Sequence, residues 1–354
     1  MKFFKYLFFL LLIVFIGSAL YFGTQDGKFT VSEQIEIIAP VQVVFNEVSD
    51  YKNWEDWGSW MKDESLKIHY PENTKGEGSF YSWESEKDGK GAMQTLSSHP
   101  HDSLIQKIIF DGALEDDGYL VNWKFNPNTN NQKTTVTWEM KGELGLKEKI
   151  LFAIKKINIE SRISEMYKKS LQNLDSVLQL KMNEYEINVS GLTQRSGGFY
   201  LYNSTASKQN EVSAKSAPMI SQLKTFMIEN NIPIDGSPFV AYLSWDEMNN
   251  STIFSVGIPT TDRVILPDNS PAITGFMPTI SAVKVTLTGK HNYLSEAYEA
   301  ADKYLLDTGF NKDENLSIVE VYTTSLPEEP NPANWKTDIY IPVQQENIEN
   351  NDLK

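Results

Sequence analysis

Two stretches in the second half of the chain share one plan, and this internal repeat limits the possible folds more than any other feature of the sequence. Residues 238–260 read PFVAYLSWDEMNNSTIFSVGIPT, and residues 317–343 read SIVEVYTTSLPEEPNPANWKTDIYIPV. Each runs as an apolar strand, a loop with a tryptophan and a second strand with Ile-Pro near its end. An internal repeat indicates one structural unit used twice. The sequence therefore predicts a sheet with two-fold character and a ligand cleft between its halves.

A predicted helix precedes each of these stretches. Residues 214–230 and 293–307 both carry an apolar stripe at three-to-four spacing, and Gly309 follows the second as a C-terminal stop. Strands are expected before each helix, at 199–202 and at 282–287. The second unit therefore repeats the plan of the first.

Composition allows two folded domains and excludes several classes of function. The chain has 354 residues, a formal net charge of -15 and no cysteine. Taking ~150 residues per domain, two domains are expected. Because a surface this acidic repels the phosphate backbone of nucleic acids, no nucleic-acid partner is predicted. Without cysteine there is no disulfide framework and no thiolate metal site.

No cofactor or metal is predicted either. The sequence contains no P-loop, no dinucleotide fingerprint and no Gly-x-Ser-x-Gly motif. The histidines do not assemble the spacing of a structural zinc site, and His99-Pro100-His101 is interpreted as a solvated loop. The four histidines are His69, His99, His101 and His291.

The N-terminal residues 1–24 predict a membrane segment. Lys2 and Lys5 precede an apolar run from Tyr6 to Gly23. Roughly 18 apolar residues are enough to span a bilayer as a helix. A cleaved signal segment is the alternative, because Gly17-Ser18-Ala19 supplies small residues for cleavage. The positive-inside rule keeps the lysines in the cytoplasm, so the soluble part is expected on the extracytoplasmic (periplasmic) side.

The region after the membrane segment predicts an antiparallel meander that ends in a long helix. Turn residues such as Asn126-Pro127-Asn128 separate strand-like runs, and an apolar stripe from Ile159 to Leu178 indicates the helix. The expected strands are 78–83, 91–96, 104–110, 118–125 and 133–142.

The start of this region resembles a known superfamily. Residues 35–60, IEIIAPVQVVFNEVSDYKNWEDWGSW, look like the opening of the START-like (SRPBCC, polyketide cyclase/lipid-transport) superfamily. The resemblance covers about residues 28–182 and implies a helix-grip fold with an apolar cavity between sheet and C-terminal helix. It implies no catalytic residues. The tryptophans Trp54, Trp57, Trp60 and Trp83 are expected either to line this cavity or to pack the short helix against the sheet.

The second half resembles the gyrase-inhibitor-like domain, the effector-binding domain of AraC-type and multidrug-sensing regulators. The residues that carry the resemblance are Glu320 within Val319–Tyr322, the Pro-rich loop and Thr337–Val343. It covers about residues 184–345 and implies an aromatic groove that holds a glutamate. No helix-turn-helix accompanies it, so a regulatory role on DNA is not implied.

The fold class expected from these observations is α+β. The predicted order is a transmembrane anchor or signal segment at 1–24, a START-like helix-grip domain at 25–182, and a duplicated βαββ effector-binding-type domain at 184–345. Residues 346–354 are predicted to be a disordered tail.

Glu320 is the candidate functional residue. It faces away from Val319 and Val321 in a strand, where it would either receive a cationic or polar ligand or face solvent. Aromatic side chains suit flat or cationic ligands, and each also fills a core well. The predicted ligand-binding residues are Glu320, Tyr322, Trp335, Tyr340, Tyr298, Tyr242 and Trp245.

These residues favour a membrane-anchored, exported binding protein for a hydrophobic or amphipathic small molecule, planar or cationic in kind. A hydrolase acting on bulky planar or strained-ring compounds is the first alternative, with Glu320 as general base and Tyr298 or Tyr322 assisting. The second alternative is an envelope scaffold without a ligand. The sequence favours a binder over an enzyme and leaves the oligomeric state open.

Overall fold

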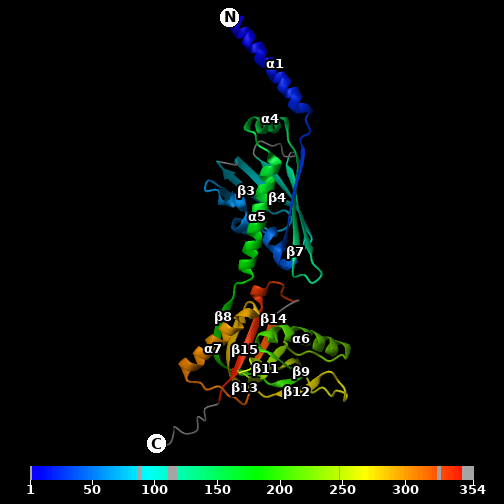
Figure 1. The fold of residues 1–354 in the computed structure, drawn as a ribbon, viewed down its shortest axis with the longest axis vertical. Coiled ribbons are helices and arrows are strands. Elements are labelled where there is room, and N and C mark those ends of the chain that lie inside the picture. Colours follow the sequence, from blue (N-terminus) through cyan, green and yellow to red (C-terminus); the bar gives the residue numbers. More distant parts are fainter. Residues whose placement is uncertain (1, 87–88, 111–117, 247, 325–327, 345–354) are drawn as a thin grey trace. The chain divides into compact units, whose positions relative to one another are not determined.

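The chain divides into two compact units in the computed structural model, Met1–Lys181 (unit 1) and Met182–Lys354 (unit 2) (Figure 1). The structure describes residues 2–86, 89–110, 118–246, 248–324 and 328–344. The predicted tail at 346–354 and most of the turn residues at 111–118 lie outside these ranges.

The first element is a single apolar helix, α1 (Lys2–Thr24). Its segment Phe3–Thr24, 22 residues long, is long and apolar enough to cross a membrane, and none of it is buried. At 1.5 Å per residue it reaches about 33 Å, slightly more than the ~30 Å hydrocarbon core of a bilayer. A signal sequence near an N-terminus has the same length and composition.

Unit 1 is built on a seven-stranded antiparallel sheet in the order β1-β7-β6-β5-β4-β3-β2. The predicted meander is confirmed, with β1 closing the sheet against β7. The strands are β1 (Lys28–Ile37), β2 (Lys67–His69), β3 (Phe80–Ser85), β4 (Gly89–His99), β5 (Ser103–Phe110), β6 (Tyr119–Pro127) and β7 (Thr134–Glu143). The helices are α2 (Val41–Ser49), α3 (Trp54–Trp57), α4 (Leu146–Lys155) and α5 (Ile159–Lys181).

The long helix α5 lies across the sheet, as a helix-grip fold requires (Figure 1). Aromatic rings join the two. Trp123 on β6 stacks on Trp138 on β7 with 4.1 Å between ring centroids, and Tyr167 on α5 stacks on Trp138 at 3.6 Å. The buried stripe of α5 includes Ile163, Tyr167, Leu171, Leu174 and Leu178, at the predicted three-to-four spacing.

Unit 2 is built on an eight-stranded antiparallel sheet in the order β12-β9-β11-β10-β14-β15-β13-β8. Its strands are β8 (Glu186–Arg195), β9 (Gly198–Lys208), β10 (Phe239–Asp246), β11 (Ser251–Thr260), β12 (Ile273–Met277), β13 (Ile280–Thr288), β14 (Ile318–Thr324) and β15 (Lys336–Pro342). Its helices are α6 (Val212–Glu229) and α7 (Leu294–Thr308).

The sheet order confirms the predicted duplication. β9-α6-β10-β11 and β13-α7-β14-β15 follow the same βαββ plan, and their strands occur as β9-β11-β10 and β14-β15-β13, in mirrored order. The equivalent strands β10 and β14 are therefore neighbours at the centre, where Val240 lies opposite Glu320.

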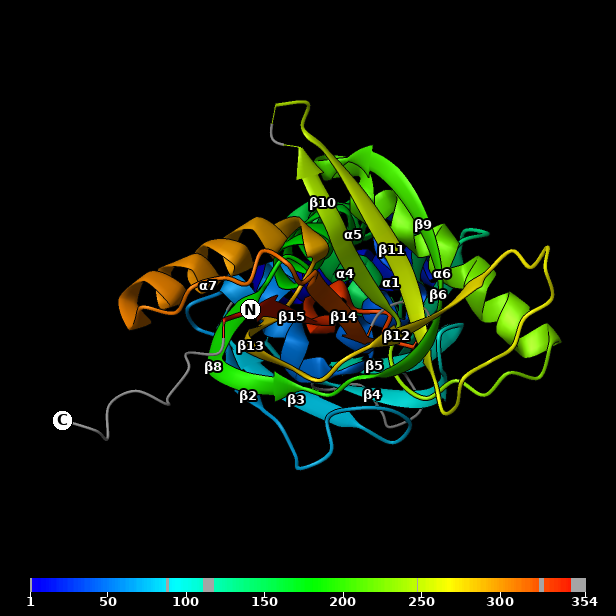
Figure 2. The same ribbon diagram turned by 90° about the horizontal axis from the view of Figure 1, so that it is seen from below.

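Both helices pack on one face of this sheet. α6 covers the half that contains β9 and β11, and α7 covers the half that contains β13 and β8. Figure 2 shows the two helices at separate ends of the sheet, with β14 and β15 between them. This arrangement leaves the central strands between two helices, which is where Glu320 lies.

Candidate functional site

Glu320 lies in the middle of β14 on the helix-covered face of the unit-2 sheet. Its pairing partners Val240 and Ile339 belong to that same face, because directly opposed residues of antiparallel strands point the same way. The side chain is 1% exposed. A carboxyl group is rarely so deeply buried without partners, so its surroundings determine what it can do.

Three tyrosine hydroxyls surround the carboxyl group. Tyr242 donates to Oε1 at 2.9 Å and Tyr298 to the same oxygen at 2.7 Å. Tyr322 donates to Oε2 at 2.9 Å. Within the described ranges, Glu320 forms no ion pair. The site therefore holds one potential negative charge with neutral donors around it.

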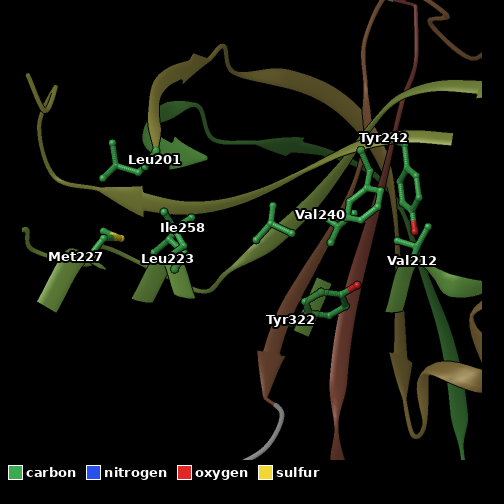
Figure 3. Close-up of a cluster of buried hydrophobic side chains, with 11 residues drawn as sticks. Leu201, Val212, Leu223, Met227, Val240, Tyr242, Ile258 and Tyr322 are labelled. Carbon is green, nitrogen blue, oxygen red and sulfur yellow. The ribbon is translucent and has the colours of Figure 1, made fainter. Parts of the chain in front are cut away.

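The repeat explains why two of these tyrosines flank Glu320. Tyr242 and Tyr322 each follow the Val240–Glu320 pair by two residues on antiparallel strands, so they lie on opposite sides of it and on the same face. Figure 3 shows both rings within the buried cluster that also contains Val240 and Val212. Tyr298 comes from the first turns of α7 and closes the site from the helix layer.

Burial dominates the electrostatics of the site. Removal from water raises the pKa of the Glu320 carboxyl above its ordinary value of 4.5, and the three tyrosine hydrogen bonds oppose that shift without cancelling it. Burial also raises the pKa of Tyr242, Tyr298 and Tyr322, next to the charge of Glu320. The three hydroxyls therefore keep their protons and act as donors.

The raised pKa of Glu320 sets a direction for the pH dependence of stability. Between the ordinary value of 4.5 and the higher folded-state pKa, the native state holds a proton that the unfolded chain has released. This contribution is complete below the ordinary value and is lost as the pH rises through the folded-state pKa. Relative to Glu320→Gln, we expect the wild type to be more stable at about pH 4.5 than at about pH 7.5. Hydrogen exchange of the β14 amides in urea measures this, and an equal difference at both pH values would contradict it.

The other predicted residues are spread over three places. Trp245, 45% exposed, stacks on Tyr242 at 4.7 Å, so it adjoins the site from the solvent side. Trp335 donates from its indole nitrogen to the Glu329 carbonyl at 2.8 Å. Its ring lies 5.4 Å from the ring of His291, which in turn adjoins Tyr322 of the site.

Tyr340 is not part of this arrangement. It pairs with Val319 and Lys284, which puts it on the face of the sheet opposite to Glu320. There its ring lies beside two cations, 5.6 Å from the Lys284 amine and 5.8 Å from the Arg195 guanidinium. The predicted place of Tyr340 around the groove is therefore corrected, because its neighbours Ile339 and Ile341 take the helix-covered face.

His291 is a neighbour of the site that the sequence did not predict. Its ring lies 4.9 Å from the ring of Tyr322, and its Nδ1 is 3.4 Å from the Ser213 hydroxyl. Burial lowers the pKa of His291, so the ring is neutral near pH 7. No described group pairs with its buried Nε2. Only tertiary packing brings this residue in, so sequence spacing gave no signal for it.

Unit 1 holds a separate cavity of about 420 Å³ between the sheet, α4 and α5. Its walls are mainly aromatic and aliphatic, and two of the predicted tryptophans, Trp60 and Trp83, contribute to them. Trp54 and Trp57 are instead fully buried in the core. Both interpretations of the tryptophan group thus hold, for different members of it.

Two polar atoms of the cavity wall have no described partner. They are the Tyr167 hydroxyl and the Trp138 indole nitrogen, both buried. Each is able to donate a hydrogen bond. Charged residues also contribute to the wall, namely Glu148, Lys155 and Arg162. A ligand here meets a mainly apolar wall, and the two buried donors belong to residues of that wall.

Within the described residues, no group of three or more histidine, aspartate or glutamate side chains is placed to hold a metal ion. His99 lies 3.3 Å from the Ser97 hydroxyl, and the His101 ring packs on Phe45 at 5.7 Å.

Comparisons with known proteins agree with this description of unit 1. The sequence model of the family described as "Polyketide cyclase / dehydrase and lipid transport" matches residues 28–179. No curated protein matches the chain.

Several solved structures are similar to parts of the chain, with sequence identities of 20% or less in the three described next. The EcmrR C-terminal domain is 20% identical over 46% of this chain and 99% of that one, with a TM-score of 0.38. EcmrR in its complex with DNA is 19% identical, over 57% of this chain and 78% of that one, with a TM-score of 0.39. MLL2253 from Mesorhizobium loti is 13% identical over 43% and 98%, with a TM-score of 0.32. The family model thus shows a similarity that is confined to residues 28–179, less than half of the chain.

Proposed function

We propose that this protein is a membrane-anchored, exported binding protein for hydrophobic small molecules, with Glu320 receiving a planar cationic ligand. The observation that carries the proposal is a carboxyl group, 1% exposed, that three neutral hydroxyls hold and no described cation pairs with. The apolar α1 would be the anchor, with the soluble part on the extracytoplasmic side.

A cationic ligand supplies what this site lacks. Ionised and buried, the carboxylate is costly unless a positive charge compensates it. Aromatic faces around the charge attract a delocalised cation as well. The ligand must displace at least one tyrosine hydroxyl, because the carboxyl group is enclosed. The stacked pair of Tyr242 and the half-exposed Trp245 lies toward solvent and is the part that would move.

A hydrolase is the second candidate, and the raised pKa of Glu320 favours it, since a general base works best near the pH of its surroundings. The enclosure of Glu320, which is 1% exposed, argues against it, because an attacking water must first reach the carboxyl group. Product formation that Glu320→Gln abolishes would establish the hydrolase. A binder gives no product.

The test compares two ligands of nearly equal shape. N-methylacridinium carries a permanent positive charge, and 9-methylacridine is neutral at about pH 8. Native mass spectrometry of the full chain, titrated with each ligand in a separate sample because the two complexes have the same mass, should show the cation bound more tightly by roughly 30-fold or more, as expected for a buried charge pair. Equal capture of both would remove the role of Glu320. Capture of neither would favour a scaffold without a ligand.

The unit-1 cavity is proposed as a second site, for an apolar ligand with a hydrogen-bond acceptor. Tyr167→Phe should leave the empty protein as stable as the wild type, because the lost hydroxyl has no described partner. It should weaken the binding of methyl laurate by roughly fivefold, which corresponds to the ~1 kcal/mol contributed by one hydrogen bond. Binding of 1-dodecene, which has no carbonyl, should not change. Displacement of a fluorescent apolar probe measures both, and equal losses would contradict a hydrogen bond to Tyr167.

A further inference from the structure

The helix α4 and the residues next to it carry a positive charge in an acidic protein. The segment 144–157 carries four lysines and one glutamate, +4 and -1, giving +3 in a chain of -15. The lysines are Lys147, Lys149, Lys155 and Lys156. No residue of α4 is buried. Basic charge therefore gathers on a helix that the core does not hold.

Large apolar side chains of α4 are also exposed. Ile154 is 75% exposed, and Leu146 and Leu151 are exposed as well. A lysine-rich helix with exposed aliphatic residues is the composition of a helix that lies in a membrane interface. In water these side chains would remain uncovered, so the helix is incomplete without a partner surface.

Hydrogen bonds hold α4 beside the end of the apolar helix α1. Lys149 donates to the carbonyl of Gln25 at 2.6 Å, and the Leu144 amide donates to the carbonyl of Gly27 at 2.9 Å. α1 ends at Thr24, so both contacts fall within three residues of it. A bilayer that α1 spans therefore has its surface within reach of α4.

One face of α4 also forms a wall of the unit-1 cavity. The lining residues Glu148, Leu151, Phe152 and Lys155 follow the three-to-four spacing of a single helix face. Because no α4 residue is buried, packing holds this wall of the cavity weakly. Movement of α4 onto another surface would open the cavity on that side.

We propose that α4 is an interfacial lid, which docks on the surface of an anionic phospholipid bilayer and opens the unit-1 cavity to an apolar ligand dissolved in it. The occupant follows from the charge, since anionic lipid attracts lysines near the surface, and from the tether to α1. This inference rests on the membrane anchor of the proposed function and is independent of Glu320.

The absence of cysteine makes a direct test possible. The full chain with Ile154→Cys, labelled with an environment-sensitive fluorophore, is reconstituted into vesicles of phosphatidylcholine alone or with about 30% phosphatidylglycerol. In anionic vesicles we expect iodide in the water to quench the label about threefold less, and nitroxide lipids to quench it strongly. About 0.5 M salt should reverse both effects. A label at Leu180→Cys on α5 should change in neither vesicle.

Charge variants separate lipid attraction from the tether. Lys147→Glu with Lys156→Asn takes the segment from +3 to zero, and Asn suits the left-handed backbone at Lys156 (φ 53). This double substitution should restore iodide quenching in anionic vesicles. The control, Lys67→Glu with Lys124→Asn, makes the same charge change elsewhere in unit 1 and should leave the label protected from iodide.

Three outcomes would overturn the proposal. Equal quenching in the two vesicles would exclude an anionic surface as the partner. Shielding that survives the loss of charge would assign it to the tether alone. A chain that fails to float with vesicles would remove the anchor as well. Retention of N-methylacridinium by the same samples reports on the Glu320 site separately, so failure of one proposal is distinguishable from failure of the other.

Discussion

Replacing Glu320 with glutamine is expected to abolish cation binding while leaving unit 2 folded and no less stable at neutral pH. The amide oxygen still accepts from Tyr242 and Tyr298, which now donate to Oε1 of Glu320 at 2.9 and 2.7 Å, and the amide nitrogen in place of Oε2 donates to the Tyr322 hydroxyl. The variant removes a charge whose burial is unfavourable, as the raised pKa of Glu320 indicates. Losing one partner of a buried charge pair costs about 2–5 kcal/mol of binding, roughly 30-fold to several thousandfold in affinity.

Leucine at the same position should have the opposite profile. It leaves the hydroxyls of Tyr242, Tyr298 and Tyr322 without their acceptor, at ~1–3 kcal/mol for each that stays buried and unpaired. Glu320→Leu should therefore destabilise unit 2 by several kcal/mol, whereas Glu320→Gln should not. A residue kept for packing alone would tolerate leucine better than glutamine.

Titration with N-methylacridinium and hydrogen exchange of the β14 amides give affinity and stability for each variant. Glu186→Gln, on the exposed start of β8, removes one negative charge from unit 2 away from the site and should change neither quantity. Undiminished cation binding by Glu320→Gln would refute the proposed role of Glu320. A Glu320→Gln protein that unfolds like Glu320→Leu would make Glu320 a structural residue.

The repeat made the fold of unit 2 predictable. The helices expected at 214–230 and 293–307 occur at Val212–Glu229 and Leu294–Thr308, because apolar stripes of that length have only one face to bury. Strand alternation placed Glu320 away from Val319 and Val321. The same alternation, applied within β15, would have turned Tyr340 away from Ile339 and Ile341.

The burial of Glu320 could not be predicted from the sequence. Whether Glu320 faces solvent or a tyrosine cluster depends on α7 lying over β14, which is a contact between distant segments. The neighbouring His291 belongs to a short turn before α7, and only the packing of Tyr322 and Trp335 encloses it. In unit 1, alternation likewise gave the strands but not the cavity, since side-chain volumes from many elements decide whether such a space is filled.

Truncating Trp54 should produce the largest loss of stability in unit 1. Its side chain is 0% exposed, and its indole nitrogen donates to the Val48 carbonyl at 2.7 Å. Its ring lies between those of Tyr51 and Trp57, 5.1 Å from each. Removing a buried tryptophan in this way costs about 3–5 kcal/mol, and domains are stable by only ~5–15 kcal/mol. Trp54→Ala should therefore leave unit 1 marginally folded.

Trp83 provides the matched control, because the same substitution there removes a side chain that is half-buried at the cavity wall. Trp83→Ala should cost clearly less than Trp54→Ala, since part of the ring already meets solvent and the cavity can enlarge without disturbing α3. Trp54→Phe should be intermediate, because it keeps an aromatic ring but leaves the Val48 carbonyl without its donor. Urea unfolding followed by near-ultraviolet circular dichroism ranks the three variants by their free energy of unfolding. Equal costs for Trp54→Ala and Trp83→Ala would contradict the central role of Trp54 in the core that holds the sheet to its helices.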